Sequence, residues 1–295
     1  MYPSPSCLPP LPVFGEVDFI VPPGACDTHA HVIGDDAERH PLIEDRSYTA
    51  PPAVESAYIA MLDNLGLQRG VLVQISTYGT DNRCMLETLR RHPDRLRGIS
   101  VVDQDCPQAE LETLHAAGVR GVRINTLLRG GVGYGQVEKL AERIAPLGWH
   151  MQFLMHARDL PDLMPLMRRL PVPGVVDHMG DLRPQDDLHS AGLDALCILM
   201  RDHGWWAKLS GAYRMGLPAD RLEDSTPLAR RLIEAAPDRV LWGSDWPHVN
   251  LHQDMPDTAA LLNLLARWAP DEALRRRILV DNPGRLYWGE GVPAG

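Results

Sequence analysis

The stretch Ala25-Cys26-Asp27-Thr28-His29-Ala30-His31-Val32 opens the alternation of strands and helices on which the fold prediction rests. It is predicted to form a strand that ends in two histidines two residues apart. Side chains at positions i and i+2 of a strand point the same way, so His29 and His31 can converge on one ion or one carbonyl oxygen. A single His-X-His pair is a weak signal, and its meaning depends on the partners that follow.

Two later stretches also run from apolar residues into polar groups at the exit of a predicted strand. They are Val175-Val176-Asp177-His178 and Val240-Leu241-Trp242-Gly243-Ser244-Asp245. Taken singly, His178 could be a hydrogen-bonded core histidine and Asp245 could cap a turn. Because the same pattern recurs at several strand ends, we predict that His29, His31, His178 and Asp245 form one site.

Short apolar runs alternate with longer segments of helical period, as in repeated βα units. The predicted strands are 25–32, 70–76, 98–103, 119–125, 149–155, 174–178, 205–210 and 240–244. The predicted helices are 52–65, 82–91, 107–117, 136–147, 160–170, 228–236, 257–268 and 271–279. Eight such units predict an α/β fold, a single-domain (β/α)8 TIM barrel over residues 25–295, with an N-terminal extension over 1–24. A doubly wound sheet is disfavoured, because no Gly-X-Gly-X-X-Gly turn follows the first strand.

Composition limits the partners and the compartment. A formal net charge of −10 disfavours binding to nucleic acid or to an anionic membrane surface. The five cysteines are scattered without a Cys-X-X-Cys pair, which indicates reduced thiols. No apolar run approaches the roughly 20 residues that span a bilayer, and the N-terminus lacks a signal-peptide pattern. We therefore expect a cytoplasmic protein, a monomer or a homo-oligomer.

In a TIM barrel the chemistry lies at the carboxyl ends of the strands and in the loops that follow. Further polar residues obey this rule, namely Ser76 and Tyr78 after the second strand, Arg123 and Arg129 at and after the fourth, and Arg214 after the seventh. The glycine-rich segment 129–135 lacks the Lys-Ser/Thr ending of a phosphate loop and is predicted to be a mobile loop at the barrel mouth.

The three arginines at one mouth of an acidic protein predict an anionic ligand, because guanidinium groups bind carboxylates through two parallel hydrogen bonds. The alternative is that Arg123 or Arg129 pairs with a local acid such as Asp103. A dicarboxylate or a sulfonated carboxylate would use several arginines, whereas a neutral sugar lactone would not.

The combined pattern resembles the amidohydrolase superfamily, in its second amidohydrolase-type branch. The resemblance covers nearly the whole chain and is carried by Pro23-Gly24-Ala25-Cys26-Asp27-Thr28-His29, Gly79-Thr80-Asp81-Asn82, Asp177-His178-Met179-Gly180, Trp242-Gly243-Ser244-Asp245-Trp246-Pro247-His248 and Asn282-Pro283-Gly284-Arg285-Leu286-Tyr287. Within the branch, these stretches are most similar to 2-pyrone-4,6-dicarboxylate lactonases and to related sulfomuconolactone and sugar-lactone hydrolases.

This resemblance implies that an acidic lactone is held by Tyr48, Ser76, Arg123, Arg129 and Arg214. Two positions depart from the pattern. Tyr78 stands where a histidine is expected in the pyrone lactonases and is itself a candidate substrate-binding residue. The fifth strand, 150–156, lacks a tyrosine expected to help hold the substrate.

The predicted reaction is hydrolysis of a ring ester by a water molecule whose proton is taken by Asp245. The substrate is expected to be 2-pyrone-4,6-dicarboxylate or a muconolactone analogue from the degradation of aromatic compounds. His29, His31 and His178, with Asp245, either bind one divalent metal such as zinc or act without metal by polarising the carbonyl. Both arrangements stay open. Three histidines and an aspartate are adequate ligands for zinc, whereas the resemblance to the pyrone lactonases implies catalysis without metal, and the fourth strand offers no lysine for a bridging carbamate.

Two further histidines are less clearly placed. His156 either adds a ligand from the fifth strand or faces the helix after it, and His248 is expected to support the structure.

Other functions fit parts of the pattern. A metal-dependent decarboxylase of the same superfamily would use the same histidines and aspartate around zinc. A sugar-acid lactonase or a lactone isomerase would share the barrel. A non-catalytic binding barrel is disfavoured, because a binder has no use for a base such as Asp245.

Overall fold

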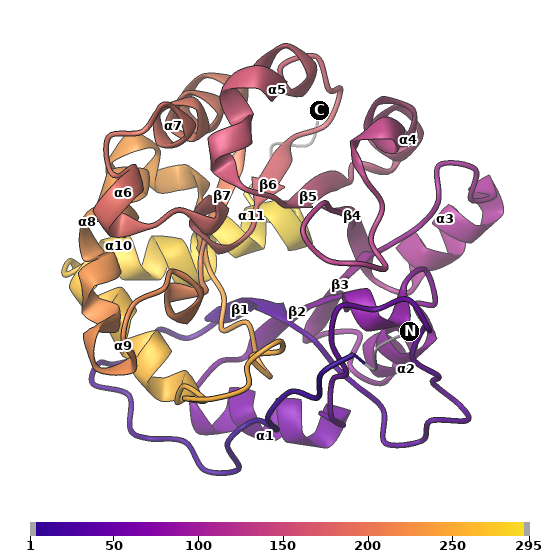
Figure 1. The fold of residues 1–295 in the computed structure, drawn as a ribbon, viewed down its shortest axis with the longest axis horizontal. Coiled ribbons are helices and arrows are strands. Elements are labelled where there is room, and N and C mark those ends of the chain that lie inside the picture. The colour runs from indigo at the N-terminus through magenta and orange to yellow at the C-terminus, as the bar shows by residue number, and fades with distance from the viewer. Residues whose placement is uncertain (1–3, 292–295) are drawn as a thin grey trace.

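The eight runs predicted as strands all form strands, and they lie in one parallel sheet in the order of the sequence. The computed structural model describes residues 4–291. Its strands are β1 (Cys26–Ala30), β2 (Arg69–Val73), β3 (Leu96–Ser100), β4 (Val119–Asn125), β5 (His150–Leu154), β6 (Gly174–Val176), β7 (Trp206–Leu209) and β8 (Val240–Trp242). Figure 1 shows them around a central axis with the helices outside.

The sheet closes where the end of β8 meets β1. The backbone N–H of Asp245 donates to the carbonyl of His29 and that of His31 donates to the carbonyl of Trp246, each over 2.8 Å. The Thr28 hydroxyl also donates to the carbonyl of Trp242 over 2.8 Å. The predicted (β/α)8 barrel is therefore confirmed, and its closure lies directly beside the two histidines of β1.

The helices form the outer ring (Figure 1). They are α1 (Glu55–Asn64), α2 (Arg83–Arg91), α3 (Gln108–Ala116), α4 (Val137–Ile144), α5 (Leu160–Met167), α6 (Pro184–Asp187), α7 (Ala191–His203), α8 (Thr226–Ala235), α9 (Thr258–Trp268), α10 (Glu272–Arg276) and α11 (Asn282–Trp288). All eight predicted helices have a counterpart. The prediction named no helix at α6, α7 or α11, and the buried side chains of α7 spread over a wide face instead of a narrow stripe.

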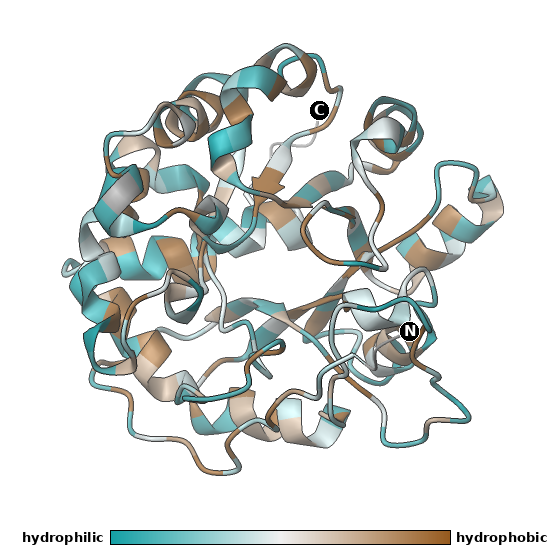
Figure 2. Ribbon diagram, in the orientation of Figure 1, coloured by the Kyte–Doolittle hydropathy of each residue, from teal (hydrophilic) through white to brown (hydrophobic). Residues whose placement is uncertain are grey.

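The helices of the ring carry both hydrophilic and hydrophobic residues (Figure 2), which lets one side pack on the barrel and the other face water. Leu89 of α2 shows how close this packing is. A Cβ atom on Gly98 of β3 would lie 2.6 Å from Leu89 Cδ1, so any larger residue there would require the Leu89 side chain to shift. All five cysteines are buried and free of disulfides, as predicted.

The described part of the N-terminal extension lies against loops of the barrel. The N–H of Cys7 donates to the carbonyl of Thr49 over 3.0 Å, and that of Leu8 donates to Leu251 over 2.8 Å. We keep the proposed division near residue 24, because β1 begins at Cys26. Among the helices of residues 4–291, none has the length and apolar character needed to cross a membrane.

Asp27 of β1 ties the closing strands together. Its carboxylate accepts hydrogen bonds from the Ser244 hydroxyl (2.6 Å), the Ser244 N–H (2.8 Å), the His29 N–H (3.1 Å) and the Tyr58 hydroxyl (3.2 Å). Burial raises the pKa of Asp27 to about 6, although these four donors favour its charged form. The carboxylate therefore couples β1 to the segment after β8 and to α1.

We expect Ser244→Ala to lower the free energy of unfolding by about 1–3 kcal/mol, because it removes one donor from a buried carboxylate. Ser56→Ala in the exposed first turn of α1 is the matched control and should leave stability unchanged. Urea unfolding followed by circular dichroism measures both. Equal stability of the two variants would contradict the role given to Asp27.

Candidate active site

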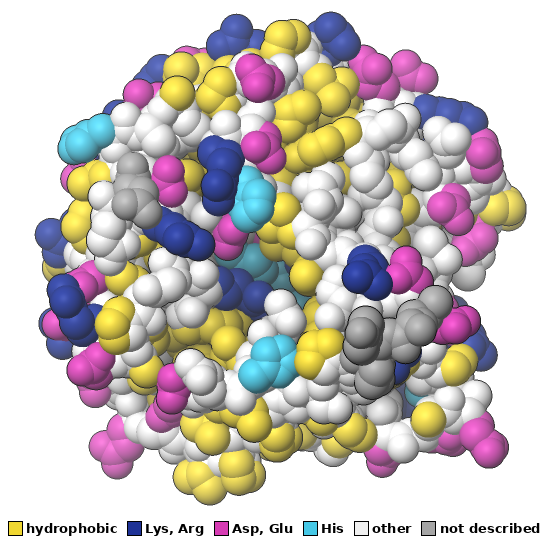
Figure 3. Space-filling view, viewed as in Figure 1, with side chains coloured by type: hydrophobic (Ala, Val, Ile, Leu, Met, Phe, Trp, Pro, Cys, Tyr) yellow, Lys and Arg dark blue, Asp and Glu magenta, His cyan; other side chains and the backbone are white. Residues whose placement is uncertain are grey.

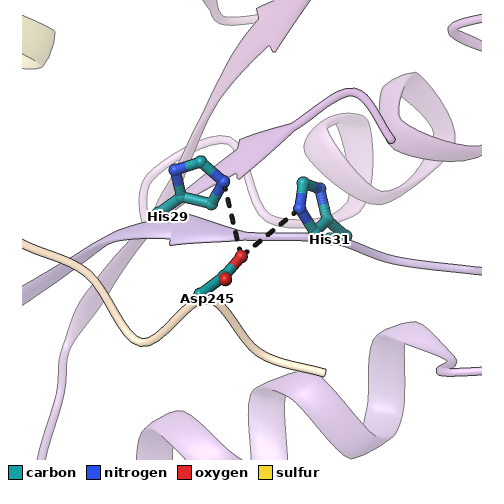
Figure 4. A group of neighbouring side chains, drawn as sticks. All are labelled: His29, His31 and Asp245. Carbon is teal, nitrogen blue, oxygen red and sulfur yellow. Dashed lines mark ion pairs between the residues drawn. The ribbon is translucent and has the colours of Figure 1, made fainter. Parts of the chain in front are cut away.

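The four predicted catalytic residues all lie at the carboxyl ends of strands and are buried together. Figure 4 shows His29 and His31 of the β1 end facing Asp245, which follows β8. Asp245 Oδ1 lies 3.7 Å from Nε2 of each histidine. In the space-filling view, histidine and cationic side chains lie at the floor of the hollow in the barrel mouth (Figure 3).

The hydrogen bonds of the two histidines fix which nitrogen faces Asp245 as an acceptor. His31 Nδ1 lies 2.7 Å from the carbonyl of Val73, which can only accept, so Nδ1 carries the proton. His29 Nδ1 lies 3.2 Å from Asp177 Oδ1, which can only accept, and 3.3 Å from Lys208 Nζ. Because Lys208 makes its shorter hydrogen bonds to the carbonyl of Thr28 and to Gln152 Oε1, we place the proton of His29 on Nδ1. Burial lowers the pKa of both imidazoles. Both are therefore neutral, and both turn a bare Nε2 toward Asp245.

The two oxygens of Asp245 have unlike surroundings. Oδ2 accepts from the Tyr213 hydroxyl over 2.5 Å and from Arg214 Nε over 2.7 Å. Oδ1 is buried and has no hydrogen-bond donor among the described residues. The Arg214 guanidinium and the surrounding imidazoles hold the pKa of Asp245 well below its usual range against the opposing effect of burial. The carboxylate is charged, with one oxygen free to accept a proton.

The backbone is strained where it presents Asp245 and His178. Their φ angles are 60° and 50°, in the left-handed region that non-glycine residues rarely adopt. At Asp245 the strain is held by backbone bonds on both sides, to the carbonyl of His29 and from the N–H of His248. The predicted strands 174–178 and 240–244 therefore end two residues early, at Val176 and Trp242.

His178 completes the cluster from a different direction. Its ring centroid lies 4.6 Å from that of His29, and its Nδ1 lies 2.9 Å from the Ser210 hydroxyl. The Ser210 hydroxyl can donate to Nδ1, which leaves Nε2 of His178 as the protonated nitrogen. Burial lowers the pKa of His178 to about 4, so the ring is neutral near pH 7.

The donor atoms of His29, His31 and Asp245 fit a divalent cation. One ligand atom from each lies within 4.8 Å of the others, and all three residues are buried. His29 Nε2 and Asp245 Oδ1 also lack hydrogen-bond partners within the described chain, as expected of atoms that share an ion or a water molecule. His178 belongs to a second such group, with His29 and Asp177, so the four predicted metal ligands are divided between two groups that share His29.

Sequence reasoning missed a buried ionic network beneath the histidines. Asp177 accepts from Gln152 Nε2 over 3.0 Å and lies 3.3 Å from Arg123 Nη2 and 3.6 Å from Lys208 Nζ. Lys208 lies in the middle of β7 and is fully buried, which lowers its pKa to about 8. Asp177 was weighed only as a partner for its neighbour His178, whereas it contacts His29.

Part of the predicted substrate-binding set lies next to this cluster. The Tyr48 hydroxyl is 3.1 Å from the Ser76 hydroxyl, and both residues are buried. Burial raises the pKa of Tyr48 to about 12, so the phenol keeps its proton. Arg123 is buried and pairs with Asp177, and its Nε has no acceptor among the described residues. The expected alternative partner, Asp103, does not pair with it.

Other members of the predicted set are engaged elsewhere. Arg129 is largely exposed and pairs with Asp45 over 3.1 Å, so it does contact a local acid, though not Asp103. Its N–H donates to the Ser47 hydroxyl over 2.9 Å. The Tyr78 hydroxyl accepts from the N–H of Gly34 over 3.1 Å.

The glycine-rich segment 129–135, predicted to be mobile, is held at its start. A Cβ atom on Gly130, whose φ is 88°, would lie 2.1 Å from the carbonyl oxygen of Ser76. The carbonyl of Val132 also accepts from the N–H of Asn125 over 2.9 Å.

Arg214 lies in the site, but its contacts extend the prediction. It was expected to bind substrate, and the structure pairs its Nε with Asp245 while one terminal nitrogen donates to the carbonyl of Val249 over 3.2 Å. The carboxylate raises the pKa of Arg214, so the guanidinium is always charged. Tyr213 was missed, although it precedes Arg214 in the same loop.

The two remaining histidines do not join the cluster. His156 Nδ1 lies 2.6 Å from Asp181 Oδ2, and the side chain is about a third exposed. His248 is buried and its Nε2 lies 3.0 Å from the Thr258 hydroxyl, in agreement with the structural role expected for it.

Comparisons with known proteins point to one family. The amidohydrolase family profile matches residues 26–288. A 2-pyrone-4,6-dicarboxylate hydrolase of Comamonas testosteroni is 39% identical over 93% of both chains. A 4-sulfomuconolactone hydrolase of Hydrogenophaga intermedia is 34% identical over 96% of this chain and 95% of its own.

A solved structure has the same fold over nearly its whole length. It is an Acinetobacter baumannii protein provisionally assigned as a 2-pyrone-4,6-dicarboxylic acid hydrolase and crystallised with citric acid bound. The TM-score is 0.79 at 27% identity, and the match covers 90% of this chain and 99% of that one.

The buried histidines predict how stability depends on pH. Burial lowers the pKa of His178 and His248 to about 4 and of His150 to about 3, from a usual value of 6.5. The unfolded chain therefore binds more protons between pH 4 and 6.5, so acidification across this window favours unfolding. Asp27, with its raised pKa, acts in the opposite direction but is outnumbered.

We expect the melting temperature to rise steadily from pH 4.5 to pH 6.5, as measured by scanning calorimetry in about 0.1 M salt. His248→Gln should flatten this rise, because it removes one of the buried groups. His203→Gln is the control, since His203 is exposed at the end of α7. A melting temperature independent of pH in the wild type would refute the neutral state of these rings.

Proposed function

The chain belongs to the amidohydrolase family, and from this premise we propose that it hydrolyses the ring ester of an acidic lactone. The observation that carries the proposal is Asp245 Oδ1, a charged carboxylate oxygen with no donor among the described residues, set 3.7 Å from two neutral imidazole nitrogens. Such an arrangement suits a water molecule that must lose a proton. The lactone hydrolases among the relatives, at 34–39% identity, support this class of reaction.

The substrate class follows from the charges of the site. Arg123 keeps a buried Nε without an acceptor, which the carboxylate of a substrate would supply. The named substrates of the two relatives both carry acidic groups, and the Acinetobacter protein binds citric acid. We place 2-pyrone-4,6-dicarboxylate first and a sulfonated muconolactone second. Tyr48 and Ser76 supply two hydroxyl groups beside the same region.

Each side chain has a distinct part in the proposed reaction. Water donates one hydrogen bond to Asp245 Oδ1 and the other to a bare Nε2 of His29 or His31, which aims its lone pair at the ester carbon. Asp245 takes a proton as the bond from water to the ester carbon forms. It returns this proton to the ring oxygen when the tetrahedral adduct collapses and the ring C–O bond breaks. His31 cannot donate to the carbonyl, because its proton is on Nδ1. Polarisation of the carbonyl therefore falls to His178 and to Arg123.

A divalent cation such as zinc would be held by His29, His31 and Asp245. When bound, it would supply Lewis-acid polarisation of the ester carbonyl. The charged side chains already present in the site oppose tight binding of a divalent cation. Asp245, one of the three would-be ligands, is already paired with Arg214 over 2.7 Å, and the cations on Arg123, Lys208 and Arg214 balance the carboxylates of Asp27, Asp177 and Asp245.

We also propose a cytoplasmic location, because the five cysteines are free thiols.

Replacing Asp245 by asparagine tests the base directly. Asp245→Asn should lower kcat by about 100-fold to 10,000-fold, because an amide cannot take the proton. The assay is the ultraviolet change on hydrolysis of 2-pyrone-4,6-dicarboxylate by the purified protein. Asp105→Asn is the matched control, since Asp105 is exposed and pairs with Lys139. Wild-type turnover in Asp245→Asn would remove Asp245 as the base, and release of carbon dioxide by the wild type would favour a decarboxylase.

Removal of metal tests whether the proposed hydrolysis requires a bound cation. We expect turnover to survive exhaustive chelation, with no zinc retained by atomic absorption on the same sample, because Arg214 already neutralises the carboxylate that a metal ion would need. Loss of turnover that zinc restores would instead assign His29, His31 and Asp245 as ligands of a required ion.

A further inference from the structure

Tyr213 is the one side chain in contact with Asp245 to which neither the sequence pattern nor the proposed reaction gives a part. It lies in the loop after β7, directly before Arg214. Its hydroxyl donates to Asp245 Oδ2 over 2.5 Å, the shortest contact that this carboxylate makes. Arg214 Nε donates to the same oxygen. Two donors on Oδ2 leave Oδ1 as the oxygen that faces His29 and His31.

The ring of Tyr213 is held from two sides. Its edge-to-face partner is His248, at 5.3 Å between centroids, and the Arg214 guanidinium lies 5.2 Å from the ring centre. His248 is itself fixed by Thr258 at the start of α9. Groups from two separate loops therefore hold the Tyr213 hydroxyl against Asp245. Because the ring is already ordered, holding the carboxylate costs little conformational entropy when the substrate binds.

The hydrogen bond from Tyr213 restricts the orientation of the Asp245 carboxylate. With a φ of 60°, Asp245 has a strained backbone conformation after β8. Rotation about its Cβ–Cγ bond would turn the free oxygen away from His29 and His31. Two donors on Oδ2 oppose this rotation, because it would break their hydrogen bonds and leave them unpaired.

We propose that Tyr213 is a positioning residue that fixes the plane of the Asp245 carboxylate, so that its free oxygen faces His29 and His31 and receives the proton of the attacking water. The proposal rests on the hydrolytic function proposed above. In this proposal Tyr213 does not contact the substrate. Removal of its hydroxyl should therefore change the rate of the chemical step and leave substrate binding unchanged.

The first test is kinetic. Tyr213→Phe keeps the ring against His248 and removes only the hydroxyl, so kcat should fall by about 10-fold to 100-fold while KM is unchanged. Tyr287→Phe is the matched control, because the Tyr287 hydroxyl is buried in α11 and has no partner among the described residues. An unchanged kcat in Tyr213→Phe, or a rise in KM at constant kcat, would overturn the proposal.

The second test does not depend on activity and so separates this proposal from the proposed function. Tyr213→Phe should lower the melting temperature in the wild-type background but not in Asp245→Ala, where the acceptor is gone. Equal losses in the two backgrounds would overturn the proposal. If no acidic lactone is hydrolysed by the wild type, the proposed function fails, and the unfolding cycle still decides whether Tyr213 holds Asp245.

Discussion

One buried carboxylate, Asp177 at the end of β6, is the constraint on which the site depends. It is contacted from four other strands, by His29 of β1, Arg123 of β4, Gln152 of β5 and Lys208 of β7. Two cations inside a barrel are tolerated only when paired, so removing this carboxylate would leave both uncompensated. Asp177 therefore compensates the charges of Arg123 and Lys208 and also orients the ring of His29.

In each side chain of the site, the contacts of one polar atom determine what the other polar atom can do in the proposed reaction. Nδ1 of His31 is bound to the carbonyl of Val73, and Nδ1 of His29 lies against Asp177. Oδ2 of Asp245 is bound to Tyr213 and Arg214. The other end of each side chain carries an atom without a proton: Nε2 of His29 and of His31 each lie 3.7 Å from Oδ1 of Asp245. Preorganisation of this kind places the cost of orienting the groups in folding and not in the reaction.

The sequence was sufficient for the order of the strands and for the grouping of His29, His31, His178 and Asp245, because each of these side chains stands at the end of a predicted strand. It was not sufficient for the network below them. Lys208 stands inside an apolar strand, and the alternation along a strand cannot say which buried residues of other strands it will meet. Strand ends were placed too late before His178 and Asp245, because a left-handed turn leaves no mark in their composition.

The unpartnered guanidinium nitrogen of Arg123 explains why such a site can select an acidic lactone within a protein whose formal net charge is −10. The outer acids lie on the surface, where water screens them, whereas Arg123 is only 4% exposed. A neutral lactone would cover the unpartnered Nε of Arg123 without giving it an acceptor, and a buried donor left unpaired costs about 1–3 kcal/mol. A carboxylate removes that cost and adds attraction. Discrimination against neutral sugar lactones therefore follows from an arginine that the fold has already buried and only partly paired.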